Sequence, residues 1–575
     1  MSKIDIEMLR HSMSHVLAKA IMTLYKGTKL AIGPAIDNGF YYDIDSNHII
    51  SNEDFEKIEN EMREIIKSNA DFKKEVISKN EALKLFADNE YKIELIKDLP
   101  ENEVISVYYL GDDFVDLCRG PHVENTKFLK SFAFKSNRVS GAYWRGNVKN
   151  KMLQRIYMFG FASFDELKSH IKMLEEAVKR DHRKLGKELG LYFISEYAPG
   201  MPFYMPNGLI LKNQLIEYWR EMHKKAGYEE IETPNALNNK LWEVSGHWGH
   251  YKQNMYTFHA DDNDEYAIKP MNCPGGMLYY KENIHSYKDL PLRVAELGKV
   301  HRKEASGTLH GLMRVRAFTQ DDAHIFMLPS QIISEVKGVI DLVDKMYKVF
   351  NLEYHLELST MPENHIGDIK DWVVAENALK EALNVISQDY VINEGDGAFY
   401  GPKIDVHIKD AIGRTWQCAT IQLDMQMPKR FNLEYVDSDG TKKEPVMIHR
   451  VIYGAVDRFI GIIIENFAGA FPTWLAPVQV KVLTITDKNE EYARKVVKTL
   501  EENNVRVESD FRNDSINKKV RSAQVAKIPY TLVVGDQEIE NNTVSVRERG
   551  KNETTVKNLN EFIKEIVDEI KQKKI

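Results

Sequence analysis

The sequence predicts a multidomain α+β protein. Its 575 residues exceed one domain of about 100–200 residues, and the length suggests about four domains. Strand-like runs in the middle of the chain, such as 293–302 and 312–328, are separated by stretches too short for crossover helices, which favours an antiparallel sheet. Over about the last 100 residues strands and helices alternate instead, which predicts a separate α/β module.

Composition excludes several classes of protein. The hydrophobic share of 43% and the charged share of 29% are ordinary for a soluble globular protein. No run of 18 apolar residues is available for a membrane span, and the N-terminus has no apolar signal region, so we expect a cytoplasmic protein. Three distant cysteines argue against a disulfide framework, and a net charge of −8 weakly disfavours a general nucleic-acid coat.

Four parts follow one another along the chain. Residues 1–160 mix helices with short strands. Residues 161–195 are predicted as a linker, with one connecting helix over 164–190 that stops at Gly190, and the three prolines of 198–208 mark a boundary. Residues 196–476 begin with a helix over 208–226 and continue with the antiparallel sheet. Residues 477–575 hold the α/β module, with strands in 478–485, 505–510, 530–535 and 543–549 and helices around 488–503, 515–526 and 558–572.

A row of polar residues points to a charged ligand. The sequence has no GxxxxGK[ST] loop and no glycine-rich dinucleotide turn. It predicts instead two strands joined by a loop that begins after HRKE (301–304). If the second strand is continuous, alternate residues share one face, which would be costly to bury without charged ligands. These residues are Arg314, Arg316, Phe318, Gln320, Asp322 and His324. The row suits a floor that receives a triphosphate at one end and a polar substrate at the other.

This stretch resembles motif 2 of the class II aminoacyl-tRNA synthetases, and its amino-acid sequence is similar to that of the threonyl enzymes. The resemblance implies that Arg302 contacts the α-phosphate of ATP, that Glu304 faces the adenine and that Arg314 is a further phosphate contact. Fixed cations at that position stabilise the charge that develops when a carboxylate attacks the phosphorus. Mg²⁺ is expected to accompany ATP.

Two further motifs extend the resemblance. HRVIYGAVDRFIGIIIENF resembles motif 3, a strand that turns at Gly454 into a helix whose Arg458 reaches the γ-phosphate. Asp457 and Ala455 depart from the family pattern and leave the finer contacts open. The helix over 208–226 leading to Pro234 would be motif 1, which implies a homodimer. Taken singly, each arginine is more often a solvated surface residue; the order and spacing of the motifs favour the functional interpretation.

The resemblance also implies one zinc ion per subunit, held by Cys273, His324 and His449. Spacing alone does not suggest a metal, since a buried cysteine or core histidine is the commoner case. Three protein ligands leave zinc open to the amino group and hydroxyl of threonine, and valine has no hydroxyl to offer. Further pocket residues implied by the family are Gln320, Asp322, Tyr400, Lys403 and Gln422.

Zinc cannot reject serine, because a missing methyl group gives only about 1–3 kcal/mol of discrimination. A second, hydrolytic site is therefore expected. His11 and His15 share one helix face, and Cys118 and His122 add two similar groups; the residues alone leave a zinc site and a structural cluster open. Residues 1–160 resemble the editing domain of the threonyl enzymes, which implies water-mediated hydrolysis of Ser-tRNA without metal, with Lys92 and Asp116 as further pocket residues.

The last module resembles the anticodon-binding domain of this subclass. That implies contacts between the tRNA and Asn513, Glu538 and Arg547, although singly each is more often a surface residue. The resemblance covers nearly the whole chain, and the three other parts correspond to an editing domain, a linker and a class II catalytic domain. Only ten residues precede His11, so a form lacking the family's N-terminal ubiquitin-like module is expected.

Two other interpretations compete with a proofreading threonine enzyme that acts on ATP, L-threonine and its tRNA. A regulatory or RNA-binding relative that has lost its chemistry should lack a motif arginine or a member of the Cys/His set, and this chain lacks neither. An enzyme for serine or proline is disfavoured by the Cys273, His324 and His449 set.

Overall fold

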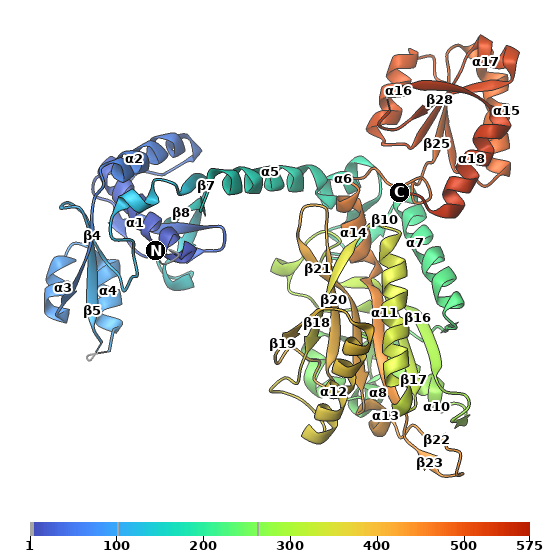
Figure 1. Ribbon diagram of the computed structural model, residues 1–575, viewed down its shortest axis with the longest axis horizontal. Helices are drawn as coiled ribbons and strands as arrows, with labels where there is room; N and C mark the ends of the chain where they lie inside the picture. The colour runs from blue at the N-terminus through green and yellow to red at the C-terminus, as the bar shows by residue number, and fades with distance from the viewer. Residues whose placement is uncertain (1–4, 101–102, 261–263, 552) are drawn as a thin grey trace. The chain divides into compact units, whose positions relative to one another are not determined.

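A computed structural model describes residues 5–100, 103–260, 264–551 and 553–575 (Figure 1). The chain forms two compact units, Met1–Glu175 and Glu176–Ile575, and the boundary between them falls inside helix α5 (Phe164–Arg180). The second unit contains both the large sheet and the C-terminal module.

The first unit is built on helix α1 (Ile6–Leu24), which begins after the N-cap Asp5. Its apolar residues join those of a five-stranded sheet, of order β1-β3-β8-β7 with β2 paired to β3, in one core. A second sheet has the order β4-β5-β6. The bounds are β1 Lys29–Leu30, β2 Ala35–Ile36, β3 Gly39–Asp45, α2 Phe55–Lys67, β4 Phe72–Ile77, α3 Lys79–Leu85, α4 Glu90–Asp98, β5 Ile105–Leu110, β6 Val115–Leu117, β7 Ala133–Tyr143 and β8 Met152–Phe161.

The single connecting helix predicted over 164–190 is wrong, because two helices occupy the segment. Asp181 interrupts it with non-helical dihedral angles (φ −49°, ψ 116°), and its carboxylate accepts a hydrogen bond from the backbone N–H of Arg183. The same residue therefore ends α5 and caps α6 (His182–Glu188). The predicted stop is confirmed: Gly190 has a positive φ of 63° just beyond α6.

An eight-stranded sheet of order β11-β16-β17-β24-β21-β20-β18-β19 dominates the second unit (Figure 1). The five inner pairings are antiparallel as predicted, and only the two edge pairings, β11 with β16 and β18 with β19, are parallel. The bounds are β11 Glu229–Glu230, β16 Leu292–His301, β17 Ala317–Met327, β18 Glu353–Ser359, β19 Tyr390–Asn393, β20 Lys403–Lys409, β21 Thr415–Asp424 and β24 Val446–Ala455.

The two faces of this sheet have different tasks. One face packs against α7 (Pro206–Lys225), α11 (Ile332–Lys348), α12 (Ile369–Ile386) and α14 (Val456–Asn466). Ala323, Ile325, Ile421 and Ile404 belong to that core. Because side chains alternate along a strand, their neighbours project from the opposite face, which we call the site face.

The continuous second strand of motif 2 is only partly confirmed. β17 begins at Ala317, so Arg314 and Arg316 lie in the preceding loop, and a bulge interrupts the register with β24 between Gln320 and Asp322. Three residues of β24 (452–454) lie opposite Asp321 at this bulge. Alternation places Asp321 on the core side with Ala323 and Ile325, where it is completely buried.

The C-terminal module has a five-stranded sheet of order β26-β25-β27-β28-β29. Its predicted strands and helices are confirmed, and two short elements, α17 and β29, were not predicted. The bounds are β25 Val480–Thr484, α15 Glu490–Glu502, β26 Val507–Asp510, α16 Ile516–Val525, β27 Tyr530–Val534, α17 Asp536–Asn541, β28 Thr543–Glu548, β29 Thr554–Asn558 and α18 Leu559–Gln572. Among the described residues no helix is long and apolar enough to cross a bilayer. Cys118, Cys273 and Cys418 are free thiols.

Candidate functional site

A cavity of about 680 Å³ opens on the site face between the motif 2 loop and the motif 3 turn. Arg302, Glu304, Arg314, Gln320 and Arg458, which the sequence predicted as active-site residues, all line it. Its walls also carry the aromatic rings of Phe318 and Trp416, so charged and stacking groups meet in one space. The cavity therefore has the composition that a nucleotide needs.

Contacts within the motif 2 loop and with neighbouring segments hold the motif 2 residues in place. Arg302 donates through Nε to the carbonyl of Pro270 (3.2 Å), and its guanidinium lies 5.2 Å from the ring centre of Phe318. Glu304 pairs with Arg314 (3.0 Å) and receives through its carbonyl a hydrogen bond from Arg316 (2.9 Å). Arg316 also donates to the carbonyl of Pro199 (3.3 Å) and to Ser306 (3.1 Å), so it braces the loop, whereas Arg302 and Arg314 line the cavity.

The motif 3 turn depends on a buried carboxylate. Gly454 has a φ of +76°, and a Cβ there would lie 2.7 Å from the carbonyl oxygen of Cys418, so glycine is required. Asp321 accepts hydrogen bonds from the backbone N–H groups of Ile452, Tyr453 and Gly454 (2.8–3.2 Å). Burial raises the pKa of Asp321 to about 7, although these donors and Arg450 oppose the shift. The turn directs Arg458, which donates to the carbonyl of Gln417 (2.7 Å).

Cys273, His324 and His449 meet on the same face. His324 and His449 are directly paired across β17 and β24, and Cys273 begins α10 (Cys273–Lys281). One ligand atom from each of the three lies within 4.8 Å of the others. Gly276 allows this approach, because a Cβ there would lie 2.9 Å from Nδ1 of His324.

The unpaired atoms of this cluster fit a metal ion. Among the described residues, Nε2 of His324 and Nδ1 of His449 are buried without a hydrogen-bond partner of good geometry, and the Cys273 thiol is the neighbour that interacts with His449. Such orphaned donors or acceptors are costly unless something binds them. The other nitrogen of His449, Nε2, donates to Asp424 (2.8 Å), as a ligand histidine commonly donates to a carboxylate. A cysteine and two histidines are a donor set that zinc accepts.

Burial and neighbouring side chains together shift the pKa values of the cluster. Burial lowers the pKa of His324 well below the usual value and so keeps the ring neutral, as a ligand must be. For His449 burial also acts downward, but the neighbouring Cys273 and Asp424 raise its pKa to about 10. Burial raises the pKa of the Cys273 thiol.

The predicted pocket residues surround the cluster unequally. Tyr400 donates to Gln422 (2.5 Å), and its ring centre lies 5.1 Å from that of His449. Asp322 is buried, which raises its pKa to about 6, and it accepts from Asn272 (3.3 Å). Lys403 instead pairs with Asp396 (3.1 Å) and Asp405 (2.8 Å).

Sequence reasoning missed Asp424 and Asn272. Asp424 follows Gln422 by two residues in β21, so the alternation that selects Gln422 for the site face selects Asp424 as well. Asn272 directly precedes Cys273, and no pattern distinguishes it. Gly298 makes room for it, since a Cβ there would lie 2.0 Å from the Asn272 side chain.

The first unit brings all the predicted editing residues together. His11 and His15 lie on α1, and Cys118 and His122 follow β6; their ligand atoms lie within 4.8 Å of one another. Cys118 Sγ is 3.3 Å from Nε2 of His11 and 3.2 Å from Nε2 of His122, so these polar atoms already face partners. Nδ1 of His15 has no such partner in the part of the chain that the structure describes.

A second network supports this cluster. Asp116 forms an ion pair with Lys92 (2.5 Å), lies 3.7 Å from Nε2 of His15 and accepts from Tyr42. Ser12 contacts Nδ1 of His122 (3.2 Å). Sequence reasoning missed Ser12, which lies beside His11, and also Tyr42, which is distant in sequence from its partners.

Burial sets the charge of this site too. It lowers the pKa of His11, His15 and His122, so the imidazoles are neutral at physiological pH. It raises the pKa of the Cys118 thiol to about 11, which keeps the sulfur protonated. A neutral histidine can accept a proton from water.

The predicted anticodon residues do not form one cluster. Asn513 is exposed in the loop after β26. Glu538 is buried in α17 and accepts from the backbone of Gly535 (2.9 Å) and from Ser545 (2.7 Å). Arg547 pairs across the sheet with Thr531, toward the opposite end of β27 from Glu538.

The fold is that of a class II aminoacyl-tRNA synthetase core. Residues 256–467 match the family described as tRNA synthetase class II core domain (G, H, P, S and T). Residues 479–569 match an anticodon binding domain, and residues 105–157 match the threonyl and alanyl tRNA synthetase second additional domain.

Related sequences and solved structures show by name which class II synthetases this chain is similar to. The threonine–tRNA ligase of Acetivibrio thermocellus is 59% identical over 566 residues, which are 98% of this chain and 88% of the relative. That of Clostridioides difficile is 58% identical over 569 residues, 99% of this chain and 88% of the relative. A structure described as the RNA binding domain of threonyl-tRNA synthetase from Cryptosporidium parvum is 42% identical, with a TM-score of 0.65 over 68% of this chain and 98% of its own. The chain belongs to the threonine–tRNA ligase family.

Proposed function

We propose that this chain activates L-threonine with ATP and transfers it to the 3′ end of the threonine tRNA, and that its N-terminal unit hydrolyses mischarged Ser-tRNA. The observation that carries this proposal is the Cys273, His324 and His449 cluster, whose two unpaired nitrogens lie on the same sheet face as the arginine-lined cavity. A pocket that selects a hydroxylated amino acid thus adjoins a pocket for a triphosphate.

Activation joins the two substrates in line. A carboxylate oxygen of threonine attacks the α-phosphorus of ATP, the bond from this phosphorus to the bridging oxygen breaks, and pyrophosphate leaves. Arg302 and Arg458, with Mg²⁺ on the phosphates, stabilise the charge that develops. A ribose hydroxyl of the tRNA then attacks the carbonyl carbon, and AMP leaves.

Selection of threonine rests on the buried cluster. Zinc, when bound to Cys273, His324 and His449, would supply a Lewis acid for the amino group and hydroxyl of threonine. Asp322 lies two residues before His324 and accepts a hydrogen bond from the hydroxyl. A site that requires a hydroxyl rejects an analogue lacking it by about 10⁴–10⁵, against about 100-fold for a purely apolar pocket.

Rejection of serine falls to the N-terminal cluster. Water attacks the ester carbonyl of Ser-tRNA while a neutral histidine takes a proton from it; the bond from this carbon to the ribose oxygen breaks, the histidine returns the proton to that oxygen, and free serine is released. Lys92 forms an ion pair with Asp116 and lies 3.3 Å from the hydroxyl of Tyr42. These contacts hold the Asp116 carboxylate in place beside the histidines. The paired Cys118 favours a water-mediated site without metal.

The remaining parts of the proposal concern partners. Asn513, Glu538 and Arg547 are proposed to contact the anticodon, although Glu538 must first give up its internal bonds. Dimerisation through α7 and a cytoplasmic location complete the proposal.

Threonine-dependent exchange between ATP and pyrophosphate tests the charging reaction. We expect exchange with threonine and with serine but not with valine in the zinc-loaded protein. Absence of exchange with threonine would overturn the proposal. For the second step, purified Ser-tRNA should be hydrolysed, and Thr-tRNA should persist.

A further inference from the structure

Three side chains on β18 and β20, near the β19 edge of the large sheet, form a cluster that the proposed chemistry does not use. His355 and Glu357 lie on β18, and His407 lies on β20. His355 and His407 are directly opposite in the antiparallel register, and Glu357 follows His355 by two residues on the same face. Cross-strand pairing thus places two imidazoles and one carboxylate together.

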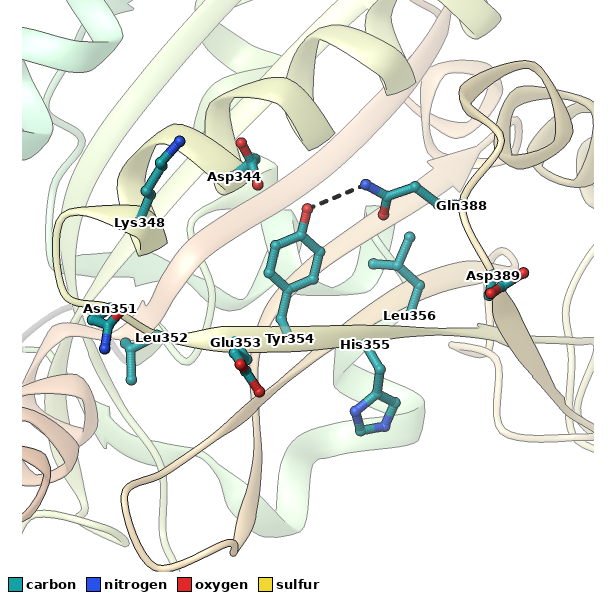
Figure 2. Close-up of a pocket in the computed structure, with 10 residues that line it drawn as sticks. All are labelled: Asp344, Lys348, Asn351, Leu352, Glu353, Tyr354, His355, Leu356, Gln388 and Asp389. Carbon is teal, nitrogen blue, oxygen red and sulfur yellow. Dashed lines mark hydrogen bonds between the residues drawn. The ribbon is translucent and has the colours of Figure 1, made fainter.

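The cavity in Figure 2 shows which way His355 points. That cavity of about 640 Å³ lies between the end of α11 and β18, and Tyr354 faces Gln388 across it (3.5 Å). His355 lies on the other side of the strand from Tyr354. It therefore belongs to the site face, with Glu357 and His407.

The distances suit a small cation. Nε2 of His355 is 3.2 Å from one oxygen of Glu357, Nε2 of His407 is 3.6 Å from the other, and one ligand atom from each residue lies within 4.8 Å of the others. Bonds of about 2.0–2.2 Å in a tetrahedral zinc site put neighbouring ligand atoms about 3.3–3.5 Å apart. Little movement would be needed to close the three around an ion.

Exposure makes the cluster accessible to an ion from solution. The side chains of His355, Glu357 and His407 are 45%, 22% and 21% exposed, in contrast to the buried Cys273 cluster. The imidazole rings are nearly parallel, with centres 5.1 Å apart, so the His355 ring has to turn from its contact with Glu357 to share an ion with His407.

We propose that His355, Glu357 and His407 form a second, thiol-free site for a divalent transition cation such as Zn²⁺. Two imidazoles and one carboxylate favour Zn²⁺ or Co²⁺ over Mg²⁺ or Ca²⁺, which take oxygen ligands, and they leave positions for water or another ligand. The ion joins β18 to β20, whose Asp405 binds Ser359 (2.8 Å) and the pocket residue Lys403 (2.8 Å). It thereby stiffens the sheet edge that holds Lys403.

Co²⁺ distinguishes this site from the other two, because both of those contain a cysteine. The experiment compares the full chain with H407A, E357Q and the control H259A, which removes an exposed strand histidine outside the cluster. Equilibrium dialysis counts bound Co²⁺, and absorption spectra separate ligand-field bands from thiolate charge-transfer bands.

We expect the full chain and H259A to bind one more Co²⁺ than H407A, with the same thiolate bands in all three proteins. The isosteric E357Q should weaken this additional ion roughly tenfold or more. Unchanged thiolate bands show that the variants are folded. Equal ion counts in the full chain, H407A and E357Q would overturn the proposal, as would an equal loss in H259A.

Discussion

The core cluster of Cys273, His324 and His449 and the N-terminal cluster of His11, His15, Cys118 and His122 use the same donor types but differ in what those donors already bind. In the core, two nitrogens are buried without partners, and Asp424 holds the outer nitrogen of His449. In the N-terminal unit, the cysteine sulfur already contacts two imidazoles, and an Asp116–Lys92 pair adjoins them. The core cluster thus leaves two imidazole nitrogens unpaired and the N-terminal cluster one, Nδ1 of His15, so the core is the better candidate for a metal.

The largest effect is expected from a substitution that removes a residue of the core cluster. C273A should lower threonine-dependent exchange by roughly 10⁴-fold, because recognition through the hydroxyl is lost. Hydrolysis of Ser-tRNA should stay unchanged. Metal analysis of C418A, which removes a buried cysteine outside the cluster, should show the native zinc content; exchange retained in C273A would contradict the role of the cluster.

Breaking the N-terminal cluster should have the complementary result. H11A should slow hydrolysis of Ser-tRNA by about 10²-fold or more, since a general base is removed, and leave exchange intact. The matched control is H48A, an exposed histidine of the same unit. Deacylation in H11A at the rate of the control would remove His11 from the mechanism.

A smaller effect is expected from changing Asp424, whose carboxylate accepts a hydrogen bond from His449. D424N keeps the size of the side chain but lowers the basicity of its partner, so zinc affinity should fall about 10–100-fold. Competition with a chromogenic chelator measures it. An unchanged affinity would mean that Asp424 is structural only.

The smallest effect concerns the frame of the core site. Asp321 has a pKa of about 7 in the folded chain and about 3.9 when unfolded, so its stabilising contribution is complete below pH 4 and declines as the pH rises through 7. D321N should lower the melting temperature by the equivalent of about 1–3 kcal/mol at pH 5.5. The difference from the unchanged chain should shrink toward pH 7.5; a difference that grows with pH would show that the ionised form is the stabilising one.

Much of this molecule was predictable, for reasons that differ between its parts. Period-two alternation and short loops gave the antiparallel sheet, and the family motifs placed Arg302 and Arg458 at one cavity. Local chemistry decided the rest: the Asp181 carboxylate divided a helix whose apolar spacing is continuous. Contacts between distant segments, such as Tyr42 with Asp116 or Asp321 with the motif 3 turn, leave no periodic signal.

Metal removal tests the contrast between the two clusters most directly, because both activities are measured on one preparation. The protein is treated with a chelator, dialysed and assayed for threonine-dependent exchange and for Ser-tRNA hydrolysis, before and after zinc is restored. We expect exchange to disappear and return with zinc, while hydrolysis keeps its rate throughout. Hydrolysis that also falls and recovers with zinc, or exchange that survives without metal, would contradict the account.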